Sequence, residues 1–349
     1  MTLTSSPAGP QAPSSREPES RRGDARGGTA AGIGASLVWG TAFLVPVLLG
    51  GWNPVIVTLG RYLVYGLLSV ILLIRGGRDV RRALRAHWRT ALAFAVAGNA
   101  GYYLLLTVGI SAAGAPLTDM VIGAIPVVVT VAGNILDPAV RWRRLVLPLA
   151  LVTAGLALVS ALELGGVHAY LHVTAAEKAA GLAAAGGAVV LWTWYALANS
   201  RFLARAPAGQ PAVSPTSWST AVGVATGAVA LAGLPGAALT GQLAAPRGAA
   251  HAGLAGLIAG VIFLGVAVSW AGTAAWNVAS SRLSPVLAGL LVNLETVTGF
   301  GYVYAARLQW PPPGQLAGLV LVMAGVILTV VMARGQSEVQ VARTRQATG

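Results

Sequence analysis

The chain has 349 residues, of which 56% are hydrophobic and only 9% are charged, and its formal net charge is +13. A soluble domain carries roughly 25% charged residues, so this chain cannot cover a single core with a polar surface. The absence of cysteine excludes a disulfide scaffold, a cysteine-ligated zinc site and a thiol nucleophile. The composition therefore predicts a membrane protein that crosses the bilayer several times.

Ten apolar segments long enough for transmembrane helices follow one another along the chain. A bilayer core about 30 Å thick requires roughly 20 residues of helix. The segments lie near 30–49, 54–74, 90–110, 116–136, 145–162, 179–199, 217–234, 252–272, 285–305 and 315–333. The alternation of period two that a transmembrane barrel needs is absent, so we predict an all-α polytopic fold with ten transmembrane helices.

The polar segments divide this series. Residues 1–29 are rich in Ser, Pro and Arg and are predicted to form a disordered cytoplasmic tail. Residues 334–349 form a second cytoplasmic tail, and residues 164–178 form a loop on the outer side. We therefore expect a first five-helix unit at 30–163 and a second at 179–333.

The basic residues indicate the orientation of the chain. With both termini in the cytoplasm, 19 of the 23 Lys and Arg residues lie on the cytoplasmic side, six of them between 75 and 89. This distribution follows the positive-inside rule. The preference for Arg over Lys, together with abundant Ala and Gly, indicates a bacterial protein of the cytoplasmic membrane. A basic surface for nucleic acid is not expected.

The two five-helix units show signs of an internal duplication. Pro126 and Gly155 are 29 residues apart, as are Thr296 and Gly325 in the second unit. Because five is an odd number, the second unit must enter the membrane in the opposite direction to the first. Inverted repeats of this kind are typical of secondary transporters.

Short motifs on several spans carry a family resemblance. They are Trp39-Gly40 with Phe43, Pro54 with Arg61-Tyr62, Ile125-Pro126, Trp276-Asn277 with Leu294-Glu295, and Gln315 with Gly318 and Gly325. In this order they resemble the ten-helix, EamA-like branch of the drug/metabolite transporter superfamily. The resemblance implies two inverted halves around a central cavity, with the fifth and tenth helices at the periphery.

The chain also departs from the family pattern. Thr296 stands where the family has proline, and no glutamate occurs near 138–139 or 308–309, where the family carries one after the fourth and ninth helices. We therefore interpret the chain as a divergent member, whose substrate does not follow from the resemblance.

Three ionisable residues lie within the predicted spans, where charge is costly and functional residues concentrate. Arg61 either binds a substrate carboxylate or phosphate, or pairs structurally near the membrane surface. Glu295 lies near the midplane and is the candidate for proton coupling or for binding a substrate amine. Its alternative role is a hydrogen bond between helices. Asp119 is better explained as a cap at the start of a helix.

Further candidates for substrate binding are polar or aromatic. Asn277 and Asn293 are buried amides close to Glu295 in the sequence, and Trp39 and Trp276 are the tryptophans most suited to line a cavity. His168 and His172 have the spacing of a metal pair but no third ligand, so we expect a solvated loop. No metal and no cofactor are predicted.

The predicted function is secondary transport, with export the expected direction. The expected cargo is a small polar or amphipathic metabolite, such as an amino acid or a derivative, and the expected partners are that substrate and the lipid bilayer. The sequence carries no nucleotide-binding motif. The alternative is a membrane-embedded enzyme acting on a lipid-linked substrate, which requires clustered catalytic groups that the sequence does not place together.

Overall fold

The computed structural model describes residues 17–49, 52–76, 78–113, 118, 121–138, 140–166, 174–204, 213–244, 252–308, 310–328 and 331, and all regular structure in these ranges is helical. The elements are α1 (Glu17–Leu48), α2 (Pro54–Gly76), α3 (Arg78–Ala95), η1 (Val96–Ala100), α4 (Gly101–Ala113), α6 (Ile125–Leu136), α7 (Trp142–Gly166), α8 (Ala175–Ala204), α9 (Pro215–Leu239), α10 (Leu254–Phe263), η2 (Leu264–Ala271), α11 (Gly272–Arg282), α12 (Pro285–Leu291) and α13 (Asn293–Ala306). A further helix spans Pro313–Leu328.

The protein is an all-α polytopic membrane protein. Within the described ranges, eight helical segments are long and apolar enough to cross a bilayer, and two shorter apolar helices lie at Ile125–Leu136 and Pro313–Leu328. Each of these ten segments overlaps one of the ten predicted spans, although Ile125–Leu136 covers only part of 116–136, and Arg78–Ile110 begins well before 90–110. The predicted all-helical fold is therefore confirmed.

The first helix differs from the prediction at its start. The sequence placed the beginning of the span at residue 30, whereas α1 begins at Glu17. No proline follows Pro18 in the polar segment before the span, so nothing interrupts the helical hydrogen bonds there. The helix thus extends on the N-terminal side beyond its apolar part. The change in hydropathy marks where the membrane span begins but not where the helix begins.

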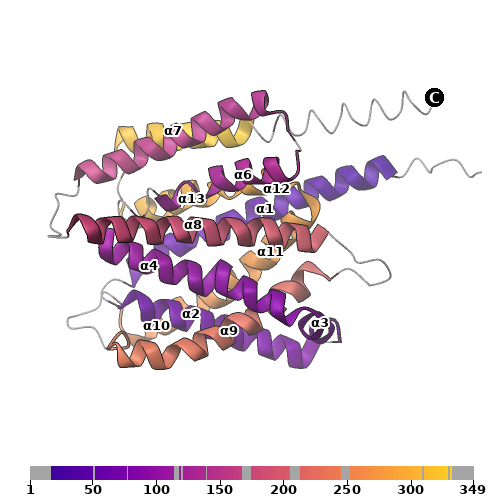
Figure 1. Ribbon diagram of the computed structural model, residues 1–349, viewed down its shortest axis with the longest axis vertical. Coiled ribbons are helices and arrows are strands. Elements are labelled where there is room, and N and C mark those ends of the chain that lie inside the picture. Colours follow the sequence, from indigo (N-terminus) through magenta and orange to yellow (C-terminus); the bar gives the residue numbers. More distant parts are fainter. Residues whose placement is uncertain are drawn as a thin grey trace, which may run out of the picture.

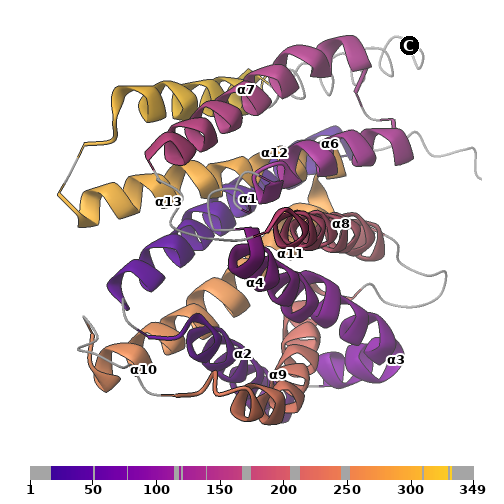
Figure 2. The same cartoon turned by 60° about the vertical axis from the view of Figure 1, so that its left-hand side comes forward.

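The helices form a bundle with one separate layer (Figures 1 and 2). The contacts pair α1 with α11 and α13, α2 with α9, α4 with α8, and α6 with α12. The separate layer is α7 packed against the helix Pro313–Leu328. Glycines allow this close packing, since a Cβ at Gly155 would lie 2.4 Å from the carbonyl oxygen of Gly318.

Two spans contain a π-helical segment, and a third is interrupted. Segment η1 joins α3 to α4, and η2 joins α10 to α11. The ninth span is interrupted at Val292, between α12 and α13. Irregularities of this kind inside a span often mark functional sites.

Helices α2 and α9 cross at a pair of facing glycines, Gly66 and Gly227. A Cβ at Gly66 would lie 2.5 Å from the Cα of Gly227, whereas Gly34 on α1 has no atom within 4 Å. Substitution Gly66→Ala should force the two backbones apart and cost about 1–3 kcal/mol. The control, Gly34→Ala, should be neutral or should stabilise by up to about 1 kcal/mol through helix propensity. Thermal unfolding midpoints of the purified variants measure both effects. An unchanged midpoint for Gly66→Ala would contradict the close crossing.

Candidate functional site

The helix interruption at Val292 has an identifiable hydrogen-bond arrangement. In an uninterrupted helix, the Leu291 carbonyl would accept a hydrogen bond from the Glu295 amide. Here the Glu295 amide donates to the Val292 carbonyl at 2.8 Å, in the tighter i→i+3 pattern. The Ser36 hydroxyl of α1 lies 2.9 Å from the Leu291 carbonyl oxygen and 3.0 Å from the Gly32 carbonyl oxygen of its own helix, and it shares its single proton between them. A buried side chain on another helix therefore satisfies the carbonyl that the interruption frees.

Glycines bring α1 close to α13 beside this interruption. A Cβ at Gly40 would lie 2.9 Å from the amide nitrogen of Gly299, and a Cβ at Gly299 would lie 2.5 Å from the Phe43 ring. The two helices are therefore in near contact along this stretch. The position of α13, and with it that of Glu295, is fixed by α1.

Glu295 lies in the first turn of α13 and is half-buried. The partial positive charge at a helix N-terminus favours a carboxylate in this position. The Arg61 guanidinium on α2 is near enough for its charge to act on this carboxyl group. The structure thus brings together two of the three ionisable residues that the sequence singled out, Arg61 and Glu295, from distant spans.

Arg61 is half-buried and is held on one side only. Its Nε donates to the Ser269 hydroxyl of η2 at 2.7 Å, and its guanidinium carbon lies 5.5 Å from the centre of the Tyr62 ring. Within the described residues, no carboxylate lies within 4 Å of the guanidinium and no other hydrogen bond engages it. The remaining N–H groups are therefore available to an anionic ligand.

Two tryptophans pack against each other near the residues that hold Arg61 and the helix interruption. The Trp39 and Trp276 rings are 5.5 Å apart, and Trp192 lies 6.5 Å from Trp276. The Trp39 indole donates to the carbonyl of Val268, the residue before Ser269, at 3.0 Å. Trp276 is buried in a cluster that includes Val292 at the interruption. Contacts therefore run from Arg61 through the tryptophans to the first turn of α13.

The Trp276 indole nitrogen is a buried donor without a partner in the described part of the chain. The side chain is only 1% exposed, and its Nε1 makes no hydrogen bond. An unsatisfied buried donor is costly, so such groups occur where a ligand or a water molecule completes them.

The two predicted asparagines have different surroundings. The Asn277 side chain accepts from Asn199 at 2.9 Å and donates to the Pro215 carbonyl at 3.3 Å, so it links α11 to α8 and α9. Asn293 is fully buried as the first residue of α13, two positions before Glu295. Asp119, His168 and His172 lie outside the described residues.

The sequence did not single out several polar residues of this region. Ser36 donates to the Leu291 carbonyl at the interruption, and Ser269 accepts from Arg61. Ser219 links α9 to α2, because its carbonyl accepts from the Tyr65 hydroxyl at 2.7 Å. A signal existed for Ser269, since it is the hydroxyl residue in the otherwise apolar segment Leu264–Ala271. No comparable signal distinguished Ser36 from other serines.

Comparison with known proteins identifies the family. The sequence profile of the EamA-like transporter family matches residues 26–161. Over 302 residues the chain is 34% identical to "Inner membrane protein YtfF" of Escherichia coli strain K12. This alignment covers 85% of the present chain and 92% of the E. coli protein. A solved crystal structure, described only as that of a protein, is 21% identical and superposes with a TM-score of 0.67 over 88% of this chain and 98% of the solved chain, so it has the same fold. The chain belongs to the EamA-like transporter family.

Proposed function

We propose that this protein is a secondary transporter that exports a small metabolite carrying both a carboxylate and an amine, such as an amino acid or a derivative. The observation that carries the proposal is the pair formed by Arg61 and Glu295. The two groups have opposite charge, lie on membrane-spanning helices and are both half-buried, yet no ion pair within 4 Å joins them. Charges kept inside a membrane without direct neutralisation are typical of a binding site.

Each group has a role that its chemistry supports. The guanidinium of Arg61 suits a substrate carboxylate, which it can bind through two parallel hydrogen bonds. Glu295 suits the substrate ammonium group, or a proton that replaces it during the return step of the cycle. The partly exposed Trp39 ring offers an apolar contact for the remainder of the substrate, and Trp276 packs behind it with an indole N–H that lacks a partner among the described residues. Asn293 completes the proposed site, and Asn277 supports it through the network that joins α8, α9 and α11.

The proposed mechanism is alternating access between two inverted repeats at 30–163 and 179–333. A shift of 170 residues, the separation of Pro126 and Thr296, moves Val96–Ala100 to 266–270, inside η2. The i→i+3 hydrogen bond from Ala124 to Val121 moves to 294 and 291, one residue from the bond between Glu295 and Val292. This correspondence of irregular backbone supports two copies of one unit, and inverted copies rocking around a shared site would produce alternating access.

The family supports transport over the alternative of an enzyme acting on lipid-linked substrates. We further propose the bacterial cytoplasmic membrane as its location, because the E. coli relative is an inner membrane protein. Both termini are proposed to be cytoplasmic, because α1 begins at the same end of the bundle as the arginine-rich α3 (Figure 1).

A first test concerns proton coupling. In proteoliposomes with an imposed pH gradient, uptake of amino acids and their derivatives should identify a transported substrate. Glu295→Gln removes the titrating group but keeps the side-chain shape, so gradient-driven accumulation should be lost while exchange of internal for external substrate continues. Wild-type accumulation by this variant would overturn the assignment of Glu295 as the coupling group.

A second test concerns the anion site. Hydrogen bonds to charged groups contribute about 1.5–3 kcal/mol, so Arg61→Gln should weaken substrate binding by roughly 10- to 100-fold. Arg141→Gln, at an exposed site on the bundle surface, provides the control and should bind substrate as the wild type does. Equal affinity of the two variants would contradict the role of Arg61.

A third test concerns orientation and uses the absence of native cysteine. Single cysteines are introduced at Ala86 in α3 and at Thr240 after α9, both of which are exposed. A membrane-impermeant maleimide should label Thr240→Cys in intact cells, and Ala86→Cys only after the membrane is permeabilised. The reverse pattern would invert the proposed topology.

A further inference from the structure

The N-terminal half of α3 concentrates positive charge on one face. Three arginines follow Arg78 at intervals of three, four and seven residues, which places them on the same side of a helix: Arg81, Arg82 and Arg85. All four side chains are exposed. These four residues form the α3 arginine face. The opposite side of the helix buries Val80 and Ala83 and packs against α9. The segment is therefore amphipathic, with a fixed apolar side and a free basic side.

Length and a kink divide α3 into a surface part and a membrane part. The segment Arg78–Ile110 has 33 residues, which would extend about 50 Å as a straight helix, more than a hydrocarbon core of about 30 Å. The backbone leaves helical geometry at His87, with φ −129° and ψ 26°. In Figure 1, α3 is seen nearly end-on at one end of the bundle, whereas α4 and α8 run across the picture. The arginines thus lie along the membrane surface, and the chain enters the membrane after His87.

An apolar stripe continues from the kink into the membrane part. Trp88, Leu92 and Val96 follow one another at intervals of four residues and are 52%, 39% and 43% exposed. The Arg89 guanidinium lies 5.3 Å from the Trp88 ring. A tryptophan at the membrane surface with aliphatic residues below it is typical of a surface in contact with lipid.

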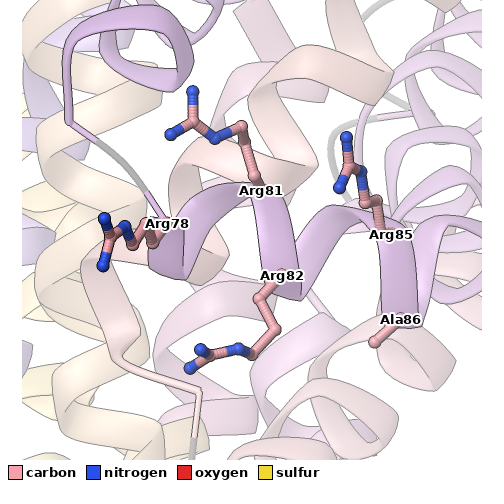
Figure 3. Close-up of a pocket in the computed structure, with 5 residues that line it drawn as sticks. All are labelled: Arg78, Arg81, Arg82, Arg85 and Ala86. Carbon is pink, nitrogen blue, oxygen red and sulfur yellow. The ribbon is translucent and has the colours of Figure 1, made fainter.

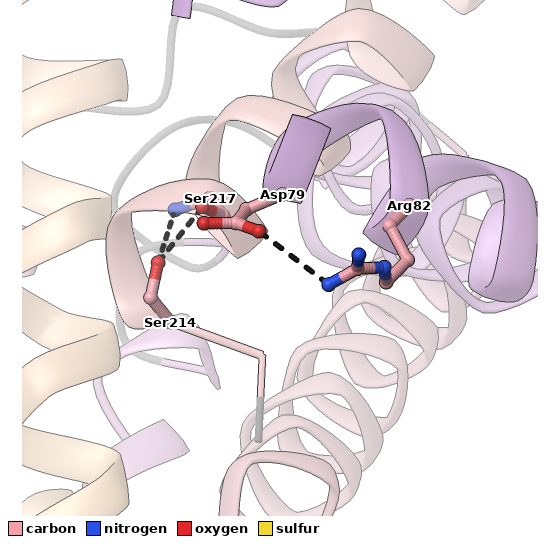
Figure 4. A network of polar contacts seen from close by, with 4 residues as sticks. All are labelled: Asp79, Arg82, Ser214 and Ser217. Atoms are coloured by element: carbon pink, nitrogen blue, oxygen red, sulfur yellow. Dashed lines mark hydrogen bonds and ion pairs between the residues drawn. The ribbon is translucent and has the colours of Figure 1, made fainter. Parts of the chain in front are cut away.

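The α3 arginine face has little internal neutralisation. Asp79 lies 3.6 Å from Arg82, with both side chains more than half exposed, and Ser214 and Ser217 at the start of α9 are hydrogen-bonded to each other (Figure 4). No carboxylate of the described residues lies within 4 Å of Arg78, Arg81 or Arg85. The four arginines and Ala86 line an open pocket of about 530 Å³ (Figure 3).

We propose that the α3 arginine face binds the phosphodiester headgroup of an anionic phospholipid, whose acyl chains lie along Trp88, Leu92 and Val96. Basic residues on an amphipathic helix at the membrane surface attract anionic headgroups. The positive-inside rule requires positive charge in this loop, but it requires neither a single arginine face nor an adjoining lipid-facing stripe. The stripe favours a phospholipid over a free phosphate ion, because only the lipid contacts both surfaces. The site holds the surface part of α3 against the membrane.

The test compares lipids bound to the full-length purified protein. Phosphatidylglycerol and phosphatidylcholine are added to protein in a neutral detergent, and retained lipid is counted by native mass spectrometry alongside the thermal unfolding midpoint. The wild type should retain several-fold more phosphatidylglycerol than phosphatidylcholine and should gain several degrees of thermal stability from it. Equal retention of the two lipids by the wild type would overturn the proposal without any variant.

Variants then locate the site. R78Q/R81Q/R85Q should lose the preference for phosphatidylglycerol, while R141Q/R143Q/R144Q, which removes equal charge from exposed positions before and within α7, should keep it. R78K/R81K/R85K keeps the positive charge and should keep most of the preference for phosphatidylglycerol. If R78Q/R81Q/R85Q does not fold, the lysine variant replaces it as the folded reference. An undiminished preference in R78Q/R81Q/R85Q, or equal loss in both glutamine variants, would contradict the assigned face. Inorganic phosphate is tested in parallel, and a thermal shift equal to that of phosphatidylglycerol would indicate a free-anion site instead.

Discussion

The structure depends on one constraint: inside a bilayer, every backbone polar group needs a partner within the protein. A continuous helix meets this condition by itself, but an interrupted one does not. The interruption at Val292 is tolerated because the Ser36 hydroxyl takes the Leu291 carbonyl that the Glu295 amide no longer reaches. The same contact ties α1 to the span that carries Glu295. A local departure from regular helix therefore becomes a long-range restraint on a charged side chain.

Close helix approach is what allows this restraint to operate. Lipid tails are as apolar as leucine side chains, so helices in a membrane associate through tight packing and hydrogen bonds between them. Glycine is found at the crossings that matter here: Gly40 and Gly299 between α1 and α13, and Gly66 and Gly227 between α2 and α9. With the backbones this near, short side chains such as Ser36 reach a carbonyl on a neighbouring helix. The glycine content of the chain thus supports the polar contacts as well as the packing.

The sequence predicted the features that depend on composition and failed where geometry decides. Ten spans followed from hydropathy, because the membrane imposes a length and polarity on each segment. Arg61 and Glu295 stood out because ionisable residues are rare in such segments, and the structure brings them near one another. Ser36 and Ser269 were missed because a single hydroxyl costs little in a span and gives no pattern. The hydrogen bonds of Asn277 with α8 and α9 were equally hidden, since its partners are 78 and 62 residues away along the chain.

The arginines of α3 and Arg61 carry their charge in different surroundings, and what stabilises the charge differs between them. Those of α3 remain exposed and lie where the membrane ends, so water and headgroups share their solvation. Arg61 lies inside the bundle, where its charge is supported by the Ser269 hydroxyl and by the Tyr62 ring. Two neutral contacts stabilise a guanidinium only partly, so the group gains most from a further anionic partner. If Glu295 filled that need directly, the two charges would cancel and neither would discriminate among ligands. Because they lie on separate helices with no ion pair within 4 Å between them, each is left without direct neutralisation by the other. Most of the basic residues behind the +13 net charge lie outside the spans, whereas the proposed chemistry rests on one arginine and one glutamate that the bilayer would otherwise exclude.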